Sequence, residues 1–394
     1  MNTQHATRKP HLDDTVSKCH FALLAAALLF ALFGCRPAWQ VTLAGPDGQP
    51  FVVDRGVLEG WGDFVEEVDG RQLVPLERAL VAGGHLVIDQ LVTVGPDETH
   101  REFEWTTASG DAWWLDDGRL EIGGEVFPVS HLEVRPPALL GQAQASITDV
   151  APTAARALGL PAPARATGRT LEVPPARHVL LLFLDGFGYV RYTEAVQEGL
   201  IPHLAALGEP LVGLTTYPPV TSASTASLLT GAPPDVHGAD RRGIRKTEVE
   251  TLFDVAAAAG LRVVAVEGEA LAFNLRSAEA QLSGDRDGDG GTDDNVLANA
   301  LAVLEAGMPD LFYVHFHGID DAGHTYGPGA PEERKKIREV DAEVGQLIEA
   351  LPPDTLVFIF ADHGMHHVDE LGRLGNHGHL VARDMFVPIW VVSR

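Results

Sequence analysis

The sequence predicts an α/β protein with a central, mostly parallel β-sheet that has helices on both faces, preceded by a small β-rich domain. Uninterrupted apolar runs alternate with amphipathic stretches from about residue 178 onward. Strands buried on both faces of a parallel sheet have this pattern. Between residues 40 and 135, short runs rich in aromatic and β-branched residues are separated by turn residues, as in small β domains. With 394 residues, 45% of them hydrophobic, the chain can form both cores.

The elements follow from these patterns. In the large domain we expect strands at 178–184, 262–267, 310–317, 356–361 and 386–392, and helices at 222–230, 249–259, 293–306 and 331–351. In the small domain we expect strands at 39–43, 51–53, 101–105, 111–115 and 119–122. Pro331 with Glu332 and Glu333 behind it is typical of a helix N-terminus. The catalytic domain would span residues 136–394, and its first part, 136–177, reads as a Pro- and Ala-rich connector with one helix.

Residues 1–34 predict a lipoprotein signal peptide. Basic residues precede the apolar run 21–33, which is shorter than the roughly 20 residues that cross a bilayer but typical of a signal peptide. The run ends in Leu-Phe-Gly-Cys35, which resembles a bacterial lipobox. We therefore expect an exported protein that is anchored to a bacterial membrane through lipidated Cys35 and faces the periplasm or the cell exterior. An uncleaved signal-anchor is the alternative. Residues 35–135 would then form a tether and the small domain, which shows no catalytic residues and reads as a structural or partner-binding module.

The net charge of −26 argues against a nucleic acid duplex as a partner, because phosphate backbones attract basic surfaces. A protein this acidic can handle an anionic phosphate ester only where positive charge is supplied locally, and bound divalent metals would supply it.

Metal-ligand residue types follow three of the predicted strands, where ligands of parallel sheets bind. They are Asp185, Asp320 with His324 four positions on, the adjacent pair Asp362 and His363, and His377 in a later Gly-Asn-His-Gly run. We expect Asp320 and His324 to lie on a loop. A single Asp-His pair is usually a surface feature, so the prediction depends on the ordered set. Mixed histidine and carboxylate ligands are typical of zinc.

Thr221 begins a predicted helix after Tyr-Pro-Pro-Val. A helix N-terminus offers free N–H groups and a partial positive charge to a phosphate. Alone, Thr221 would be read as a helix cap. Beside a metal ion, its hydroxyl would become a nucleophile with a lowered pKa.

Residues 178–394 resemble the alkaline-phosphatase superfamily, and within it the nucleotide pyrophosphatase/type I phosphodiesterase branch. The matching blocks are Leu-Phe-Leu-Asp185-Gly-Phe-Gly, Tyr-Pro-Pro-Val-Thr221, Pro-Asp-Val-His237-Gly, Asp320-Asp-Ala-Gly-His324-Thr-Tyr-Gly-Pro, Ala-Asp362-His363-Gly-Met and Asn-His377-Gly. The resemblance implies two Zn(2+) ions. One would be held by Asp185, Asp362, His363 and Thr221, and the other by Asp320, His324 and His377. It also implies that Thr221 attacks phosphorus and that water then releases the product from a phosphothreonine. His237 is not a ligand in the family, so we read it as structural.

Two departures from the family pattern concern specificity and chain order. Ser222 and Ser224 are the expected substrate-binding residues, but Ser224 stands where the branch often has Asn. A basic cluster could compensate or could be a solvated loop: Arg241, Arg242, Arg245 and Lys246. Monoester and diester preference therefore both remain open. Segment 146–171 resembles one that family members carry after the last metal-binding histidine. We therefore hypothesise a circular permutation, which predicts that Arg394 lies near residues 139–146. A coincidental Ala/Pro-rich helix is the alternative.

The acidic run that contains Asp285, Asp287, Asp289 and Asp293 resembles a calcium loop. The closing Glu of an EF-hand is missing, because Val296 occupies its place. A solvated acidic loop is the competing interpretation.

The sequence as a whole predicts a zinc-dependent hydrolase of phosphate esters, of phosphodiesterase, nucleotide pyrophosphatase or phosphatase type, acting on a small substrate. A sulfatase is disfavoured, since no Cys/Ser-x-Pro-x-Arg motif is present. The alternative is a non-catalytic lipoprotein of this fold that binds a ligand or partner. The sequence makes no prediction of the oligomeric state.

Overall fold

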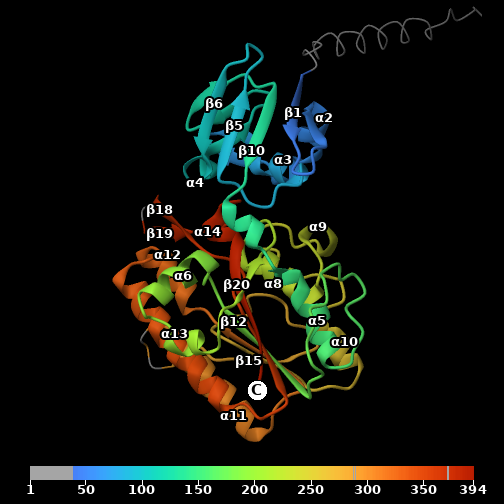
Figure 1. Ribbon diagram of the computed structural model, residues 1–394, viewed down its shortest axis with the longest axis vertical. Helices are drawn as coiled ribbons and strands as arrows, with labels where there is room; N and C mark the ends of the chain where they lie inside the picture. Colours follow the sequence, from blue (N-terminus) through green and yellow to red (C-terminus); the bar gives the residue numbers. More distant parts are fainter. Residues whose placement is uncertain (1–38, 287, 289, 371) are drawn as a thin grey trace, which may run out of the picture.

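The computed structural model describes residues 39–286, 288, 290–370 and 372–394. The predicted signal peptide and the predicted lipidation site Cys35 lie outside these residues. None of the described helices combines the length and the apolar character needed to cross a lipid bilayer. The described chain forms a smaller, β-rich part and a larger α/β part (Figure 1).

The larger part is built on an eight-stranded sheet. All its pairs are parallel except those of β20, which runs antiparallel to both of its neighbours. The predicted fold class, an α/β domain with a mostly parallel sheet, is confirmed. In spatial order the strands are β11 (Ala145–Ser146), β13 (Leu211–Leu214), β20 (Phe386–Ser393), β17 (Thr355–Phe360), β12 (His178–Leu184), β16 (Leu311–Phe316), β14 (Val263–Glu267) and β15 (Glu279–Leu282).

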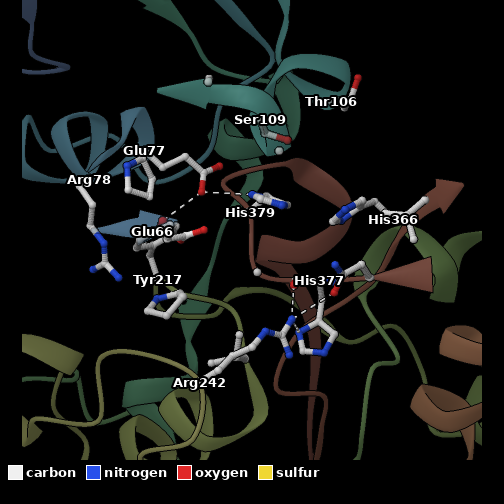
Figure 2. A pocket seen from close by; sticks show the side chains of 18 of the residues that line it. Glu66, Glu77, Arg78, Thr106, Ser109, Tyr217, Arg242, His366, His377 and His379 are labelled. Atoms are coloured by element: carbon white, nitrogen blue, oxygen red, sulfur yellow. Dashed lines mark hydrogen bonds and ion pairs between the residues drawn. The ribbon is translucent and has the colours of Figure 1, made fainter. Parts of the chain in front are cut away.

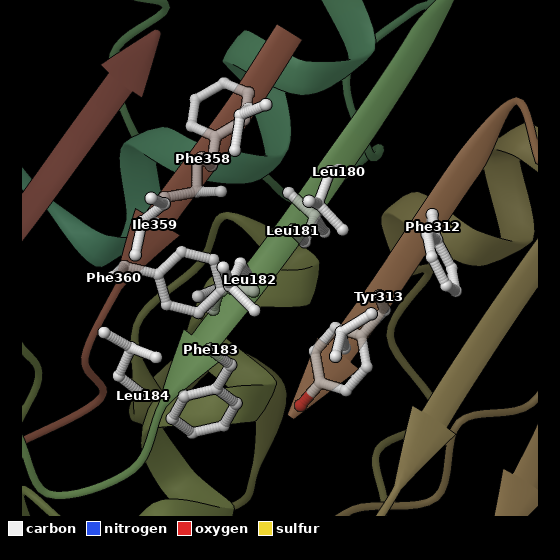
Figure 3. Packing of buried hydrophobic residues seen from close by; sticks show 14 of the residues in the cluster. Leu180, Leu181, Leu182, Phe183, Leu184, Phe312, Tyr313, Phe358, Ile359 and Phe360 are labelled. Atoms are coloured by element: carbon white, nitrogen blue, oxygen red, sulfur yellow. The ribbon is translucent and has the colours of Figure 1, made fainter. Parts of the chain in front are cut away.

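The central strand β12 explains why its sequence is apolar throughout. Every residue of β12 is buried, as is every residue of its neighbours β16 and β17. A strand covered on both faces needs apolar side chains at odd and even positions alike. Figure 3 shows the result in the middle of the sheet, where the Phe183 ring packs 5.5 Å from Phe360 and 6.2 Å from Tyr313 between ring centroids.

Two layers of helices cover the sheet, one on each face (Figure 1). One layer contains α5 (Val150–Ala157), α8 (Thr221–Thr230), α9 (Pro234–His237) and α10 (Leu252–Ala258). The other contains α6 (Tyr189–Gln197), α7 (Pro202–Ala206), α11 (Asp293–Ala306), α12 (Gly318–Tyr326) and α13 (Pro331–Ala350). Helix α10 begins later than predicted because Thr251 and Asp254 form a capping box at its start.

The smaller part contains two five-stranded sheets. One consists of β2 (Pro50–Asp54), β1 (Gln40–Ala44), β10 (His131–Arg135), β5 (Gln90–Val94) and β6 (His100–Glu104). The other consists of β3 (Glu66–Val68), β4 (Arg71–Pro75), β7 (Ala112–Trp114), β8 (Leu120–Ile122) and β9 (Glu125–Phe127). Its helices are α2 (Arg55–Gly60), α3 (Leu76–Ala82) and α4 (Trp105–Ala108). Trp105 and Trp114 are fully buried in its core.

The two parts share that core. Leu380, Val381 and Met385, from the segment around α14 (Ala382–Met385), pack among the apolar residues of the smaller part. Ile88 of the smaller part also forms a parallel bridge with Val381. The smaller part therefore packs against the segment that follows His377. The hairpin of β18 (His366–Glu370) and β19 (Arg373–Asn376) precedes His377.

The connector contributes to the larger part. β11 joins the edge of the eight-stranded sheet, and α5 lies in its main core. The proximity expected from a circular permutation is not found. Ala145 pairs with Gly213, which faces Val387 near the start of β20, whereas Arg394 follows the other end of β20 and hydrogen-bonds to Thr355. Seven residues of extended strand separate these levels by roughly 23 Å, so this prediction was wrong.

Candidate metal centre

Two neighbouring parallel strands end beside each other and are followed directly by metal-ligand side chains. Asp185 follows β12, and Asp362 and His363 follow β17. The register pairs Phe183 with Phe360, so these carboxyl ends lie at one edge of the sheet. All three ligand-type side chains are buried.

Thr221 is the first residue of α8 and lies at the same edge. Its Oγ1 is 3.3 Å from Nε2 of His363. The first N–H groups of a helix have no intrahelical acceptor, and the helix dipole adds a partial positive charge there. The position therefore combines a hydroxyl with a place for an anion.

A first group of ligand-type residues surrounds Nε2 of His363. This atom lies 3.2 Å from Oδ2 of Asp362 and 3.5 Å from Oδ1 of Asp185. The other oxygen of Asp362, Oδ1, accepts the N–H groups of Gly186 and His363. Oδ1 of Asp362 thus holds the side chain in place, while Oδ2 remains beside Nε2 of His363 and can bind a metal.

A second group contains Asp320, His324 and His377. Asp320 and His324 stand on α12 rather than on the predicted loop, and their i,i+4 spacing brings Oδ2 to 3.2 Å from Nε2. Nε2 of His377 lies 3.8 Å from Oδ1 of Asp320. Gly323, which suggested a loop, is needed for packing: a Cβ there would lie 2.6 Å from the sulfur of Met365.

Backbone carbonyls orient all three histidines of the two groups. Each Nδ1 lies within hydrogen-bond distance of one: Gly364 for His363 at 3.0 Å, Pro219 for His377 at 2.8 Å and Gly375 for His324 at 2.7 Å. A carbonyl only accepts, so Nδ1 carries the hydrogen and Nε2 keeps the lone pair that can bind a metal. The guanidinium of Arg373 also contacts the His324 ring, with Nη2 2.9 Å from Nε2.

The electrostatics of the two groups favour bound cations. Asp185 Oδ1, Asp320 Oδ1 and Asp362 Oδ2 are buried without a hydrogen-bond partner among the described residues. Burial and the charges of Asp185 and Asp320 raise the pKa of Asp362 well above its usual range. Burial also holds the pKa of His377 well below its usual range, which favours the neutral, metal-binding ring. Divalent cations would neutralise these carboxylates, and the nitrogen and oxygen donors fit zinc.

A cavity of about 790 Å³ opens over the candidate centre. Its lining includes Thr221, Asp320, Arg242 and Arg245. Two of the four basic residues singled out in the sequence therefore face the space where a phosphate ester would lie.

Of the two predicted substrate-binding serines, only Ser222 lines this cavity. Ser224 is fully buried, and its Oγ lies 2.9 Å from Oγ1 of Thr215. The prediction for Ser224 was wrong, because its side chain faces β13 across the helix and its hydroxyl is already hydrogen-bonded there.

A second cavity, of about 650 Å³, lies on the other side of Arg242, between the two parts of the chain (Figure 2). Arg242 donates from Nη2 to the carbonyl oxygen of His377 and, at 3.2 Å, to Oδ1 of Asn376. Glu77 of the smaller part accepts from the Tyr217 hydroxyl at 3.0 Å. The wall of this cavity thus joins the smaller part to the candidate centre.

The predicted calcium loop is only partly described. Asp287 and Asp289 lie outside the described residues, and Asp285 accepts backbone N–H groups of Gly288 and Gly290. Asp293 is buried, and its two oxygens accept the N–H groups of His317 and Gly318. Asp293 therefore anchors the start of α12, and calcium binding stays a prediction.

Three polar residues at the centre were not predicted: Glu267 and His315, which are buried, and His317, which is partly exposed. Asp185 and the two histidines form a further group with ligand atoms within 4.8 Å of one another. The signal was a His-x-His alternation in and just after the apolar strand β16, together with an acidic residue at the end of β14. None of the sequence blocks that carry the family resemblance contains these three residues.

Residues 241–383 match the family model described as type I phosphodiesterase / nucleotide pyrophosphatase. This part of the chain is thus similar to the type I phosphodiesterase/nucleotide pyrophosphatase family. The resemblance predicted from the motifs is thereby confirmed. The matched region includes the ligand-type residues from Asp320 to His377, while Asp185 and Thr221 precede it.

Among curated proteins, the chain is similar over short stretches to longer proteins. The GPI ethanolamine phosphate transferase 3 catalytic subunit of Mus musculus is 40% identical over 73 residues, which is 18% of this chain and 7% of the relative. Ectonucleotide pyrophosphatase/phosphodiesterase family member 7 of Homo sapiens is 41% identical over 66 residues, 16% of this chain and 14% of the relative. The chain thus matches only a small share of these relatives' length.

Similar solved structures include phosphonoacetate hydrolase from Sinorhizobium meliloti 1021 in complex with phosphonoacetate, with a TM-score of 0.40 and 20% identity over 52% of this chain and 60% of that one. Murine ectonucleotide pyrophosphatase/phosphodiesterase 5 in complex with AMP has a TM-score of 0.41 and 17% identity over 50% of this chain and 59% of that one.

Proposed function

We propose that this protein is a hydrolase of small phosphate esters that holds two zinc ions and uses Thr221 as its nucleophile. The observation that carries the proposal is the position of the Thr221 hydroxyl, at a helix N-terminus and 3.3 Å from a buried histidine nitrogen that is itself grouped with two carboxylates. The family match over residues 241–383 supports the reaction class.

The residues present would divide the work. Asp185, Asp362, His363 and Thr221 would hold one zinc ion, and Asp320, His324 and His377 the other. Bound zinc would supply Lewis-acid charge that lowers the pKa of the hydroxyl and offsets negative charge on the substrate. The free N–H groups in the first turn of α8 would bind phosphoryl oxygens, and Arg242 would add a cation at the rim of the cavity.

The reaction would consist of two displacements at phosphorus. Oγ1 of Thr221 forms a bond to phosphorus as the bond to the leaving alcohol breaks. Water then cleaves the Thr221 phosphoester and restores the hydroxyl. Most of the rate enhancement in such reactions comes from positioning and charge stabilisation, and the buried, pre-oriented ligands described above supply both.

The names of the transferase relatives suggest a second acceptor for the same intermediate. In that case an alcohol would take the place of water in the second displacement. The roles of Thr221 and of the metal-ligand residues would be unchanged. Product analysis in the presence of an added amino alcohol separates the two outcomes, because transfer yields a new ester and hydrolysis does not.

The test compares purified, zinc-reconstituted protein with Thr221→Ala and Thr221→Ser on an aryl phosphomonoester and the matching diester. We expect Thr221→Ala to lower kcat by roughly three orders of magnitude or more, with its bound zinc retained, while Thr221→Ser keeps measurable turnover. Equal turnover in Thr221→Ala would contradict the proposal. Protein that binds zinc but turns over neither ester would favour the non-catalytic, ligand-binding alternative.

A further inference from the structure

Beside the proposed two-zinc centre lies a cluster of four buried or nearly buried polar groups, of which only Asp185 has a role in that centre. They come from three strands that are neighbours in the sheet: Asp185 after β12, His315 and His317 at the end of β16, and Glu267 at the end of β14. Asp185, Glu267 and His315 are buried, and the side chain of His317 is 21% exposed. Such a concentration of polar groups in a core requires mutual compensation.

Glu267 determines which nitrogen of each ring carries a hydrogen. Its Oε2 lies 2.9 Å from Nδ1 of His315 and 3.0 Å from Nε2 of His317. A carboxylate oxygen accepts hydrogen bonds, so both rings donate to Glu267 from these atoms. The opposite nitrogens, Nε2 of His315 and Nδ1 of His317, are left with lone pairs. A carboxylate behind a metal-binding histidine is the usual arrangement at metal sites.

Both lone pairs face the same oxygen of Asp185. Oδ2 of Asp185 lies 3.1 Å from Nε2 of His315 and 3.5 Å from Nδ1 of His317. Three acceptors so close together repel one another unless a metal ion or a proton lies between them. Ligand atoms bonded to one metal at about 2.1 Å stand roughly 3.0–3.4 Å apart, which agrees with the first distance and nearly with the second.

The site is also accessible and shared. His317 lines the cavity over the candidate centre, so an ion has a path of entry and an open coordination position. Asp185 uses its two oxygens for two groups: Oδ1 lies 3.5 Å from His363, and Oδ2 faces His315 and His317. Two imidazoles and one carboxylate favour a borderline divalent ion such as zinc over magnesium or calcium.

We propose that Asp185, His315 and His317 bind a third divalent cation, with Glu267 orienting both rings. Asp185 would then bridge this ion and the one beside His363. With only three protein ligands, one of them shared and one partly exposed, the third ion would be the most weakly held of the three. A hydrogen-bonded network that holds a proton in place of the metal is the competing arrangement.

Metal stoichiometry tests the proposal without any assay of turnover. Metal-free protein is titrated with zinc by calorimetry, and the bound zinc is counted by elemental analysis. We expect three equivalents in the wild type and two in both His317→Gln and Glu267→Gln. The control His178→Gln changes a buried histidine at the opposite end of β12 and should keep three. Two equivalents in the wild type, or equal counts in wild type and His317→Gln, would overturn the proposal.

Anomalous diffraction at the zinc edge separates this proposal from the proposed function. A third peak between Asp185 and His317 that vanishes in His317→Gln, while peaks beside His363 and His324 remain, would support the third site. Only two peaks, beside His363 and His324, would refute the third site and leave the two-zinc proposal standing. A peak at the third site with none beside His324 would support the third site and refute the two-zinc proposal.

Discussion

Oγ1 of Thr221 lies 3.3 Å from Nε2 of His363, although the two residues are 142 positions apart and belong to different kinds of element. Thr221 opens a helix, and His363 follows a parallel strand. A helix N-terminus and the end of a strand meet at the carboxyl edge of the sheet, so a phosphate-binding position is combined with a buried ligand cluster there.

Asp362→Asn should have opposite effects with and without metal. In metal-free protein, burial and the charges of Asp185 and Asp320 raise the pKa of Asp362. An ionised Asp362 is therefore unfavourable at neutral pH, and the neutral amide should raise Tm by roughly 2–4 °C. In zinc-loaded protein the same change removes a ligand and should lower Tm. Thermal unfolding with and without a chelator measures both, and a change of the same sign in the two conditions would contradict the metal assignment.

Arg242→Ala should lower kcat/KM for phosphate esters by about 10- to 100-fold, because Arg242 lines the cavity over the centre and donates to the carbonyl of His377. Arg241→Ala is a matched control, since Arg241 lines only the second cavity and its side chain is 46% exposed. Steady-state kinetics of both variants decide the matter. Equal losses in the two would mean that the general charge of this loop matters rather than the position of Arg242.

Glu77→Gln should loosen the contact between the two parts of the chain. Glu77 is buried and accepts from the Tyr217 hydroxyl, the N–H of Leu380 and, at 3.3 Å, Nδ1 of His379 (Figure 2). Removal of this charge takes away the main partner of the partly buried His379 ring, whose pKa Glu77 raises to about 9 against the effect of burial. We expect a loss of about 2–4 kcal/mol of unfolding free energy.

Denaturant unfolding of Glu77→Gln measures this loss, with Glu66→Gln as the control. Glu66 lines the same cavity, but its side chain is exposed. The scatter of surface substitutions is about 0.5 kcal/mol. Unfolding free energies of the two variants that agree within this range would show that Glu77 does not stabilise the contact between the two parts.

His237 should make the protein less stable in mild acid. Burial lowers its pKa from 6.5 to about 4, and its Nε2 lies 2.8 Å from Oγ of Ser227. Above pH 6.5 the ring is neutral in both the folded and the unfolded state. Between pH 6.5 and 4 only the unfolded chain binds the proton, so stability falls by up to about 3 kcal/mol. In His237→Gln this component should be missing, and a pH dependence identical to that of the wild type would contradict the argument.

The sequence predicted the central strands well, because burial on both faces imposes an apolar pattern that can be read directly. The run at 178–184 coincides with β12. The direction of β20 could not be predicted, since an apolar run reads the same in a parallel and an antiparallel strand. The position of Arg394 relative to residues 139–146 depends on that direction.

The motif residues of the centre were predicted from the family blocks, and the structure brings all of them to one edge of the sheet. The errors concern features that depend on tertiary contacts. Gly323 suggested a loop because glycine disfavours helices, but Met365 requires the glycine inside α12. Ser224 was expected at the substrate because it stands where the related branch often has Asn, yet it faces Thr215. The acidic residue Glu267 at the end of an apolar run was too weak a signal to use, because its role depends on two histidines 48 and 50 positions away.

Rapid-quench mass spectrometry of the peptide that contains Thr221 tests the central claim most directly. Zinc-loaded protein is mixed with a phosphate ester, quenched in acid during the first turnover and digested. We expect a phosphoryl or phosphomonoester group on Thr221 that decays as product forms and is missing in Thr221→Ala. Turnover with Thr221 unmodified, or with the group on another residue, would contradict it.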